Sequence, residues 1–256
     1  MSMQDDETLQ MYVEESREHL ADIENDLLII EEGGADIDEE LVNKVFRAAH
    51  SIKGGAGFMG LDNIKELAHK MENILGMIRS KEIVPNPEVI NILLLAFDKL
   101  RELINDVEES NTIDIADHLV ALKGLTSVSL PDEEKEGISN MLDIHMPDGN
   151  IAFSVSEFDI SQARKHGMYI YLVEYDLIHD VQNKDKTPLD VVREMQESGN
   201  ILESKIEITA VGTLESDVSS LNRLPFLVLF ASIIERDIIN SVLDVDEEHI
   251  HMINED

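Results

Sequence analysis

The stretch from residue 41 to residue 60 reads LVNKVFRAAHSIKGGAGFMG and is the most informative part of the chain. Its apolar side chains recur every three or four residues, which is the spacing of one face of an α-helix. The segment therefore predicts an amphipathic helix that buries this face against other helices. The residues expected on the buried face are Val42, Val45, Ala49 and Ile52.

Segments with the same period lie on both sides of this stretch, and together they predict an all-α, antiparallel bundle of four to five helices over residues 1–125. Gly33-Gly34 stops the first run, and Pro85-Asn86-Pro87 separates the third helix from the fourth, with Asn86 as the expected cap. Because the connections are short, neighbouring helices are expected to run antiparallel. The expected helical runs cover about 9–30, 41–52, 62–78, 89–107 and 114–123.

The pattern changes after Gly124. Residues 126–147 are mostly polar and are expected to form an acidic linker. From 148 to 256, short β-favouring runs alternate with helical ones, and the segment Thr187-Pro188-Leu189-Asp190 is typical of a helix start. The order strand–helix–strand–strand–helix–strand predicts a smaller α+β domain of the ferredoxin-like, split βαβ kind. Its strands are expected at 168–177, 201–211, 224–234 and 249–253, and its helices at 187–199 and 235–243.

The charge balance restricts the partners of the chain. Acidic residues outnumber basic ones 54 to 20, for a net charge of −34. This field repels nucleic-acid phosphates and anionic lipids, so neither nucleic-acid binding nor membrane binding is expected. The longest apolar stretch, Leu224–Ile234, has 11 residues, whereas a membrane span needs roughly 20. With a polar, acidic N-terminus and no cysteine, the chain is expected to be cytoplasmic and to lack disulfides and thiolate chemistry.

Three glycines fall within four residues, at positions 54, 55 and 57, about one turn beyond His50. Each glycine inside a helix costs about 1 kcal/mol relative to alanine. One glycine needs no special explanation, but three suggest a helix surface kept flat so that another backbone can approach. Helical spacing places Arg47, His50, Lys53, Gly54 and Gly57 on one face. We therefore expect His50 to project outward, beside a cation and bare backbone.

This face suits a histidine that accepts a phosphoryl group and then releases it. An imidazole nitrogen can attack phosphorus, and the phosphoramidate that forms is labile enough to pass the group on. A carboxylate that accepts the proton of Nδ1 would fix the tautomer and leave Nε2 with its lone pair. His69 and Glu72 share a face of the next helix, which could meet His50 if the two helices pack antiparallel. Lys53 would offset the charge of the phosphoryl oxygens.

Two segments resemble the histidine phosphotransfer (HPt) domain of the chemotaxis histidine kinases of the CheA family. They are residues 46–57, FRAAHSIKGGAG, and residues 69–75, HKMENIL. The resemblance covers roughly residues 5–124 and implies that His50 is the phosphorylated residue. It also implies that Lys53 and His69 line the site and that Glu72 hydrogen-bonds His50. Phe58 departs from the pattern, because the best-known members have a smaller residue there.

Residues 148–256 resemble, by pattern more than by motif, the docking domain that binds the response regulator in CheA-like proteins. The sequence contains neither the G-x-x-x-x-G-K-[ST] nor the G-x-G-x-x-G motif of nucleotide binding. The chain is therefore expected to bind no cofactor itself. The implied partners are the ATP-binding domain of a histidine kinase, in cis or in trans, and a receiver domain, and these would supply the ATP and Mg²⁺.

Other functions use the same residues. The bundle could bind receiver domains as a non-catalytic interaction module, without carrying a phosphoryl group. Glu66 and His69 match the Glu-x-x-His motif of di-iron bundles, but such sites need a second copy, and residues 1–125 contain none. His249 and His251 could ligate a metal from one strand, but two ligands are too few. No metal site is therefore expected.

Overall fold

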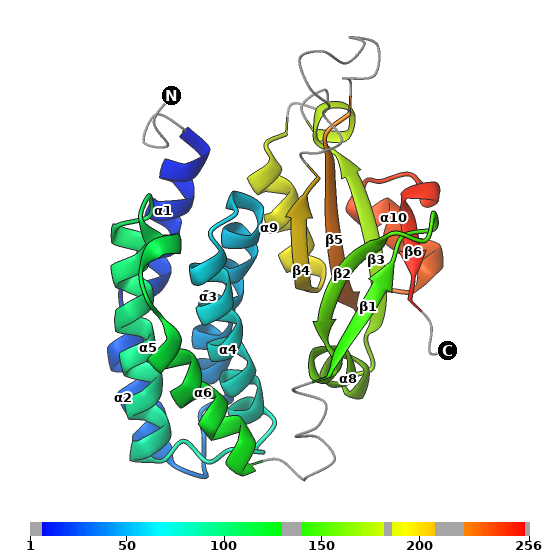
Figure 1. Cartoon of the computed structure of the whole chain (residues 1–256). Coiled ribbons are helices and arrows are strands. Elements are labelled where there is room, and N and C mark those ends of the chain that lie inside the picture. The colour runs from blue at the N-terminus through cyan, green and yellow to red at the C-terminus, as the bar shows by residue number, and fades with distance from the viewer. Residues whose placement is uncertain (1–6, 130–139, 182–185, 208–222, 254–256) are drawn as a thin grey trace. The chain divides into compact units, whose positions relative to one another are not determined.

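The structure is a computed structural model, which describes residues 7–129, 140–181, 186–207 and 223–253. The chain divides into two compact units, Met1–Lys135 and Glu136–Asp256. The first unit is built from helices and the second combines strands with shorter helices (Figure 1). A helical bundle followed by a smaller domain with a sheet was predicted, and the structure confirms this.

Six α-helices make up the described part of the first unit, and a short 3-10 helix, η2 (Ser110–Thr112), lies between the last two. Their lengths and order follow the apolar periodicity of the sequence, and α3 packs along α4 over much of its length. The helices are α1 (Glu7–Leu20), α2 (Ile23–Gly33), α3 (Glu39–Met59), α4 (Asp62–Arg79), α5 (Pro87–Asn105) and α6 (Ala116–Ser129).

The first predicted helical run is two helices rather than one. The chain bends at Ala21 and Asp22, between α1 and α2. Leu20 and Ile23 flank the bend, and each is only 1% exposed. The bend therefore lets one apolar side chain before it and one after it both reach the core. The apolar spacing of the sequence continues across the bend, so it did not indicate two helices.

The caps that the sequence predicted are confirmed. The Asn86 side chain accepts a hydrogen bond from the amide of Val89 at 3.0 Å, and Pro87 is the first residue of α5. Thr187 and Asp190 form a reciprocal capping box at the start of a helix in the second unit. Such caps satisfy amides that the helix itself leaves without a carbonyl partner.

The second unit contains a two-stranded hairpin and a four-stranded antiparallel sheet. In chain order, its strands are β1 (Met141–His145), β2 (Ile151–Ser156), β3 (Tyr169–Asp176), β4 (Asn200–Ile206), β5 (Pro225–Ser232) and β6 (Ile250–Met252). Its helices are α8 (Glu157–Lys165), η3 (Leu177–Val181, a π-helix), α9 (Pro188–Ser198), α10 (Arg236–Leu243) and η7 (Glu247–His249, a 3-10 helix).

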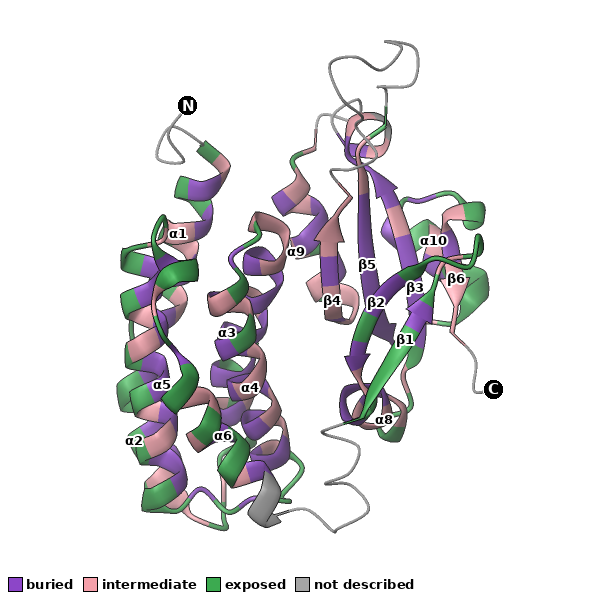
Figure 2. Cartoon of the chain, in the orientation of Figure 1, coloured by how far each residue is buried: buried purple, intermediate pink, exposed green. Residues whose placement is uncertain are grey.

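The four-stranded sheet has the order β4-β5-β3-β6, and the central pair aligns Tyr171 with Phe230. Figure 2 shows β5 buried along nearly its whole length and β1 exposed along most of it. One sheet face packs against Ile144, Phe153 and other apolar residues of the hairpin and α8. On the other face, the Tyr175 hydroxyl donates to the carbonyl of Leu243 at the end of α10 (3.1 Å). The sheet is therefore covered on both sides.

The predicted linker, residues 126–147, is wrong at both ends. Helix α6 continues to Ser129, and strand β1 occupies Met141–His145. Only Ile144 of β1 is buried, because the strand pairs with β2 alone and presents its other side chains to solvent. A strand that buries only one side chain needs few apolar residues, so its sequence looks like that of a linker. Residues 130–139 of the predicted linker lie outside the described residues.

Candidate functional site

Helix α3 carries His50 and Lys53 three residues apart. The helix begins after Asp38, whose side chain accepts hydrogen bonds from two amides of the first turn at 3.0 and 3.1 Å. It continues for 21 residues through all three glycines and ends at Gly60, which has a φ of 67°. The expected helical run ended at residue 52, whereas the helix continues through all three glycines.

Gly55 has a packing role that the sequence did not indicate. A Cβ atom at this position would lie 2.5 and 2.6 Å from two ring carbons of Tyr12 on α1. The Tyr12 ring is buried, and its hydroxyl donates to the carbonyl of Ile52 at 3.1 Å, so the ring is held in place. Burial raises the pKa of Tyr12, which keeps the hydroxyl protonated as a donor. Gly55 therefore allows α1 to approach α3.

Helix α4 supplies the carboxylate that joins the two α3 side chains. Glu72 Oε1 lies 2.9 Å from Nδ1 of His50, and Glu72 Oε2 lies 2.7 Å from Nζ of Lys53. His50 and Lys53 are each 4% exposed, and Glu72 is 6% exposed, so all three residues are buried. The sequence predicted that Glu72 would meet His50 across antiparallel helices, and in the structure Glu72 contacts both His50 and Lys53.

Two opposing effects set the charge of Glu72. Burial alone would raise the pKa of its carboxyl, but the Lys53 ammonium and the His50 imidazole outweigh that effect. The pKa of Glu72 is therefore held well below its usual range, and the group is a carboxylate at neutral pH. A buried charge of this kind is tolerable only because both of its oxygens have partners.

The carboxylate fixes the proton on the imidazole. An ionised carboxylate has no hydrogen to donate, so the short contact with Glu72 requires a proton on Nδ1 of His50. In a neutral ring, the lone pair then resides on Nε2. The geometry thus prepares Nε2 as the nucleophilic atom.

The expectation that the imidazole projects clear of the bundle is wrong, because His50 is only 4% exposed. The ring turns toward α4, where Glu72 holds Nδ1. It also lies beside Phe46, one turn earlier on α3, with the ring centroids 6.1 Å apart and the planes within 7° of parallel. Contacts across the helix interface, rather than solvent, therefore determine the direction of the side chain.

The other predicted site residues lie on the same two helices with different exposure. Arg47 is exposed, Gly54 is buried and Gly57 is half-buried, so the predicted approach surface is not uniformly open. His69 is half-buried on α4, about one turn before Glu72. Its role as a wall of the site, and the role of the three α3 residues in partner approach, stay predictions.

Sequence reasoning missed the roles of Phe46 and Arg79. The guanidinium carbon of Arg79, at the end of α4, lies 4.2 Å from the centroid of the Phe46 ring. A signal was available, since Phe46 precedes His50 by four residues and Arg79 follows Glu72 by seven. Both spacings keep residues on one helix face. A side chain on one helix therefore touches the ring that borders His50 on the other.

Within residues 7–129, 140–181, 186–207 and 223–253, no group of three His, Asp or Glu side chains is arranged to hold a metal ion. No helix in the same ranges is both long and apolar enough to cross a bilayer.

Comparison with known families places the helical unit. The family model described as Hpt domain matches residues 7–110, which include His50, Lys53 and Glu72. These residues form a histidine phosphotransfer domain. The matched residues therefore contain the whole hydrogen-bonded site, and the match ends at the first residue of the 3-10 helix η2.

The relatives of the chain extend the match beyond the Hpt domain. It is 30% identical over 230 residues to the chemotaxis protein CheA of Salmonella typhimurium, covering 85% of this chain and 33% of the relative. It is 29% identical over 208 residues to the chemotaxis protein CheA of Rhizobium meliloti, covering 76% of this chain and 27% of the relative. The chain thus spans about a third or less of the length of these proteins.

Solved structures of CheA domains also match part of this chain. One is the phosphorylated P1 domain of CheA3 in complex with CheY6 from R. sphaeroides, at 25% identity and a TM-score of 0.43, covering 48% of this chain and 98% of that one. Another is the CheA phosphotransferase domain from Thermotoga maritima, at 32% identity and a TM-score of 0.36, covering 39% of this chain and 92% of that one.

Proposed function

We propose that His50 carries a phosphoryl group between a histidine kinase and a receiver domain, in a chemotaxis-type two-component pathway. The observation that carries this proposal is the 2.9 Å contact between Nδ1 of His50 and the Glu72 carboxylate, which leaves the lone pair on Nε2. The match of residues 7–110 to the Hpt domain family supports it. The relatives named chemotaxis protein CheA indicate the pathway.

The chemistry has two steps. In the first, the Nε2 lone pair attacks the γ-phosphorus of ATP, the N–P bond forms, and the bond to the leaving oxygen of ADP breaks with its electron pair remaining on ADP. In the second, an aspartate oxygen of the receiver attacks phosphorus, and the N–P electron pair returns to Nε2. Glu72 accepts the Nδ1 hydrogen bond throughout, and it stabilises the positive charge that develops on the ring.

Lys53 would assist both steps through its charge. Its ammonium lies 2.7 Å from Glu72 and, at three residues from His50, on the same side of α3. An ammonium has three N–H donors, so one bond to Glu72 leaves donors that can face phosphoryl oxygens. Since only 4% of His50 is exposed, transfer also requires that Nε2 becomes accessible to the partner.

The partners would provide the remaining components. We propose that the ATP-binding domain of a histidine kinase, in cis or in trans, holds ATP, and that kinase and receiver each provide Mg²⁺. The chain itself would bind no cofactor, and it would act in the cytoplasm. It would neither bind nucleic acid nor insert into a membrane, consistent with its net charge of −34.

For the second unit we propose a split βαβ, ferredoxin-like fold that docks the response regulator. The element order β3-α9-β4-β5-α10-β6 and the sheet order β4-β5-β3-β6 support the fold, because both central strands are flanked by antiparallel neighbours. The hairpin β1-β2 and α8 would be additions to that core. Matches to CheA that reach well beyond residue 110 support the docking role.

Labelling tests the phosphoacceptor directly. The chain is incubated with a cognate kinase domain, Mg²⁺ and γ-labelled ATP, and acid-labile label on the chain is measured. The wild type should be labelled and His50→Gln should not be, because its side chain has no nucleophilic nitrogen. Acid-labile label retained by His50→Gln would refute the assignment. Receiver binding without any label on the wild type would favour a non-catalytic interaction module.

A deletion tests the docking role. Removal of the second unit, residues 136–256, should slow transfer from His50 to the receiver and leave phosphorylation of His50 nearly unchanged, since docking affects only the second step. Equal losses in both steps would contradict a docking role.

A further inference from the structure

We propose that Arg79 positions the His50 imidazole by way of Phe46, and so helps to keep Nδ1 on Glu72 and the lone pair on Nε2. The inference rests on the proposed function of His50. Arg79 touches Phe46 and not the reacting nitrogen, so it is a positioning residue rather than a catalytic one.

The facing sides of α3 and α4 form successive layers. His50 meets Glu72 in one layer. In the next, Phe46 faces Gly76, where a Cβ atom would lie 3.7 Å from Cε2 of the Phe46 ring. Beyond it, Nη1 of Arg79 donates to Oδ1 of Asn43 at 3.4 Å. The layers run backward along α3 as they run forward along α4, so Arg79 reaches over the Phe46 layer at the antiparallel interface.

The guanidinium of Arg79 packs on the aromatic ring of Phe46. It lies 4.2 Å from the Phe46 centroid, within the range of a cation–π contact. Burial lowers the pKa of Arg79, while the Glu72 carboxylate opposes that effect and the nearby Arg47 adds to it. Partial burial of a cation is unfavourable unless its contacts compensate. The Glu72 carboxylate supplies an opposing charge, while the face of Phe46 and the 3.4 Å bond to Asn43 supply contacts to the guanidinium itself.

Phe46 in turn limits the freedom of the imidazole. It is 8% exposed, and its ring lies nearly parallel to that of His50, with planes 7° apart. A histidine ring has a broad, roughly two-fold torsion about its last side-chain bond. A half-turn of the ring would bring Cδ2 to the place of Nδ1, so the Glu72 carboxylate would lose its N–H donor and the Nδ1–H tautomer would lose its stabilisation. A Phe46 ring held in this position packs along the imidazole in the orientation that keeps Nδ1 on Glu72, and Arg79 holds Phe46 there.

The first test observes the ring without any phosphorylation. The full chain is labelled with ¹⁵N at the histidine ring nitrogens, and the tautomer of His50 is measured by NMR in the wild type, Arg79→Gln and Arg79→Lys. The wild type should show the Nδ1–H tautomer. Arg79→Gln should populate the Nε2–H form, and Arg79→Lys should restore the wild-type tautomer only in part, because an ammonium lacks the planar stacking surface.

A matched arginine serves as the control. Arg101 on α5 is also half-buried, and it donates to the carbonyl of Leu20 at 3.3 Å, so it too connects two helices of the bundle. Arg101→Gln should leave the His50 tautomer as in the wild type. If Arg79→Gln and Arg101→Gln both leave it unchanged, or both alter it equally, the positioning role of Arg79 is refuted.

The second test is a double-mutant cycle on the rate of phosphorylation. Arg79→Gln should lower that rate about threefold to tenfold, the range expected for loss of a half-buried cation–aromatic contact. In a Phe46→Leu background the same substitution should have almost no further effect, because Arg79 acts through Phe46. If the rate losses of the two substitutions are additive, the proposal is overturned, and Arg79 would instead act on the site directly through its charge. Failure of wild-type labelling would instead refute the proposed function, while the tautomer measurement still tests Arg79.

Discussion

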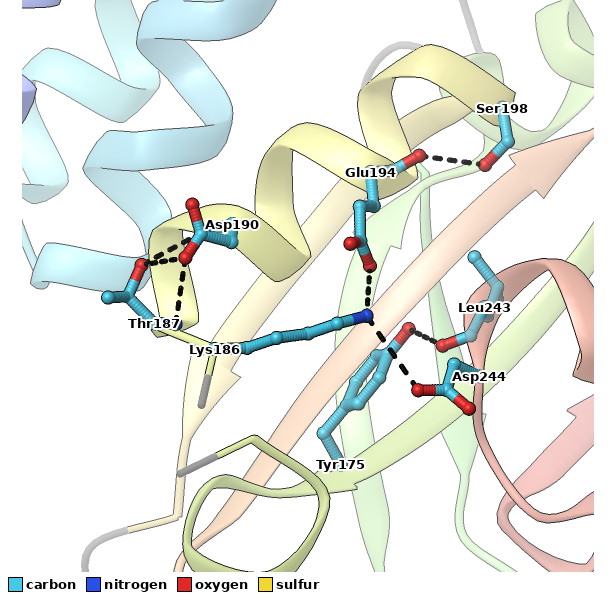
Figure 3. Close-up of polar contacts among 8 residues, drawn as sticks. All are labelled: Tyr175, Lys186, Thr187, Asp190, Glu194, Ser198, Leu243 and Asp244. Atoms are coloured by element: carbon cyan, nitrogen blue, oxygen red, sulfur yellow. Dashed lines mark hydrogen bonds and ion pairs between the residues drawn. The ribbon is translucent and has the colours of Figure 1, made fainter. Parts of the chain in front are cut away.

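One ionic cluster in each unit of the chain invites comparison, because the two have similar composition but opposite arrangement. In the Hpt domain, a single carboxylate, Glu72, is shared by His50 and Lys53. In the second unit, a single ammonium, Lys186, is shared by Glu194 at 2.8 Å and by Asp244 at 3.7 Å (Figure 3). The first cluster joins α3 to α4, and the second joins the segment before α9 to α9 itself and to the end of α10.

Burial separates the two clusters. The Glu72 side chain is 8% exposed, whereas those of Lys186, Glu194 and Asp244 are 27%, 43% and 56% exposed. Hydrogen bonding to Glu194 raises the pKa of Lys186. The amine is already protonated at neutral pH, so this shift does not change its charge. At Glu72, burial and two donors act against each other. The same ion-pair chemistry therefore ties elements together at the surface and orients a nucleophile in the interior.

The largest expected effect is that of Glu72→Gln. The substitution leaves the buried Lys53 ammonium without its counter-charge, and breaking a buried ion pair in this way costs about 3–5 kcal/mol. Hydrogen exchange of the α3 and α4 amides in the full chain measures the loss within the Hpt domain. The matched change Glu194→Gln should leave those amides unaffected. Similar protection in Glu72→Gln and the wild type would show that burial does not distinguish the clusters.

Acidification should reveal the same difference. The pKa of Glu72 is lower in the folded chain than its unfolded value of about 4.3. Its contribution to stability is therefore complete above that unfolded value and is lost as the pH falls toward the folded-state pKa. Denaturation followed below about pH 4.5 should show a steeper loss for the wild type than for Glu72→Gln. Equal slopes would contradict the depressed pKa.

Glycine substitutions compare close packing with open space. Gly55→Ala should destabilise the Hpt domain by about 1–3 kcal/mol, because the new methyl group overlaps the Tyr12 ring. A methyl group at Gly124, in the exposed part of α6, would meet no neighbouring element within 4 Å, so Gly124→Ala should stabilise by up to about 1 kcal/mol. Thermal denaturation of both variants checks the signs. A neutral Gly55→Ala would show that Tyr12 can move despite its bond to Ile52.

The smallest expected effect is that of Lys186→Met. Exposed ion pairs contribute about 0–1 kcal/mol and weaken with salt. Denaturation of the second unit should therefore shift slightly at low ionic strength, and the shift should disappear at high ionic strength. A large, salt-independent loss would mean that this cluster is energetically closer to that of Glu72 than its exposure indicates.

The helical architecture was predictable because the apolar period of 3.6 is a local property. The same is true of the Asn86 cap and the Thr187–Asp190 capping box, which depend on residues within one turn. The meeting of His50 with Glu72 followed from adding one assumption, that successive helices run antiparallel. These features needed no knowledge of distant contacts.

The exposure of His50 was not predictable in the same way. It follows Ala49, a core residue, by about 100° around the helix, so it lies at the border of the buried face. Contacts with α4, above all with Glu72, determine that the side chain is buried rather than exposed. Arg79 was missed for the same reason, since its contact with Phe46 joins residues 33 positions apart in the sequence. Strand β1 was missed because only Ile144 is buried.

The sharing of Glu72 between His50 and Lys53 has a consequence for evolution. One carboxylate holds the tautomer of the first and neutralises the second, so a substitution at position 72 changes nucleophilicity and folding at once. A substitution of Glu72 that changes the nucleophilicity of His50 therefore also changes the stability of the fold, so the two properties cannot be selected separately at this position. Adaptation to a faster or slower kinase would have to use residues that border the ring without bearing its counter-charge.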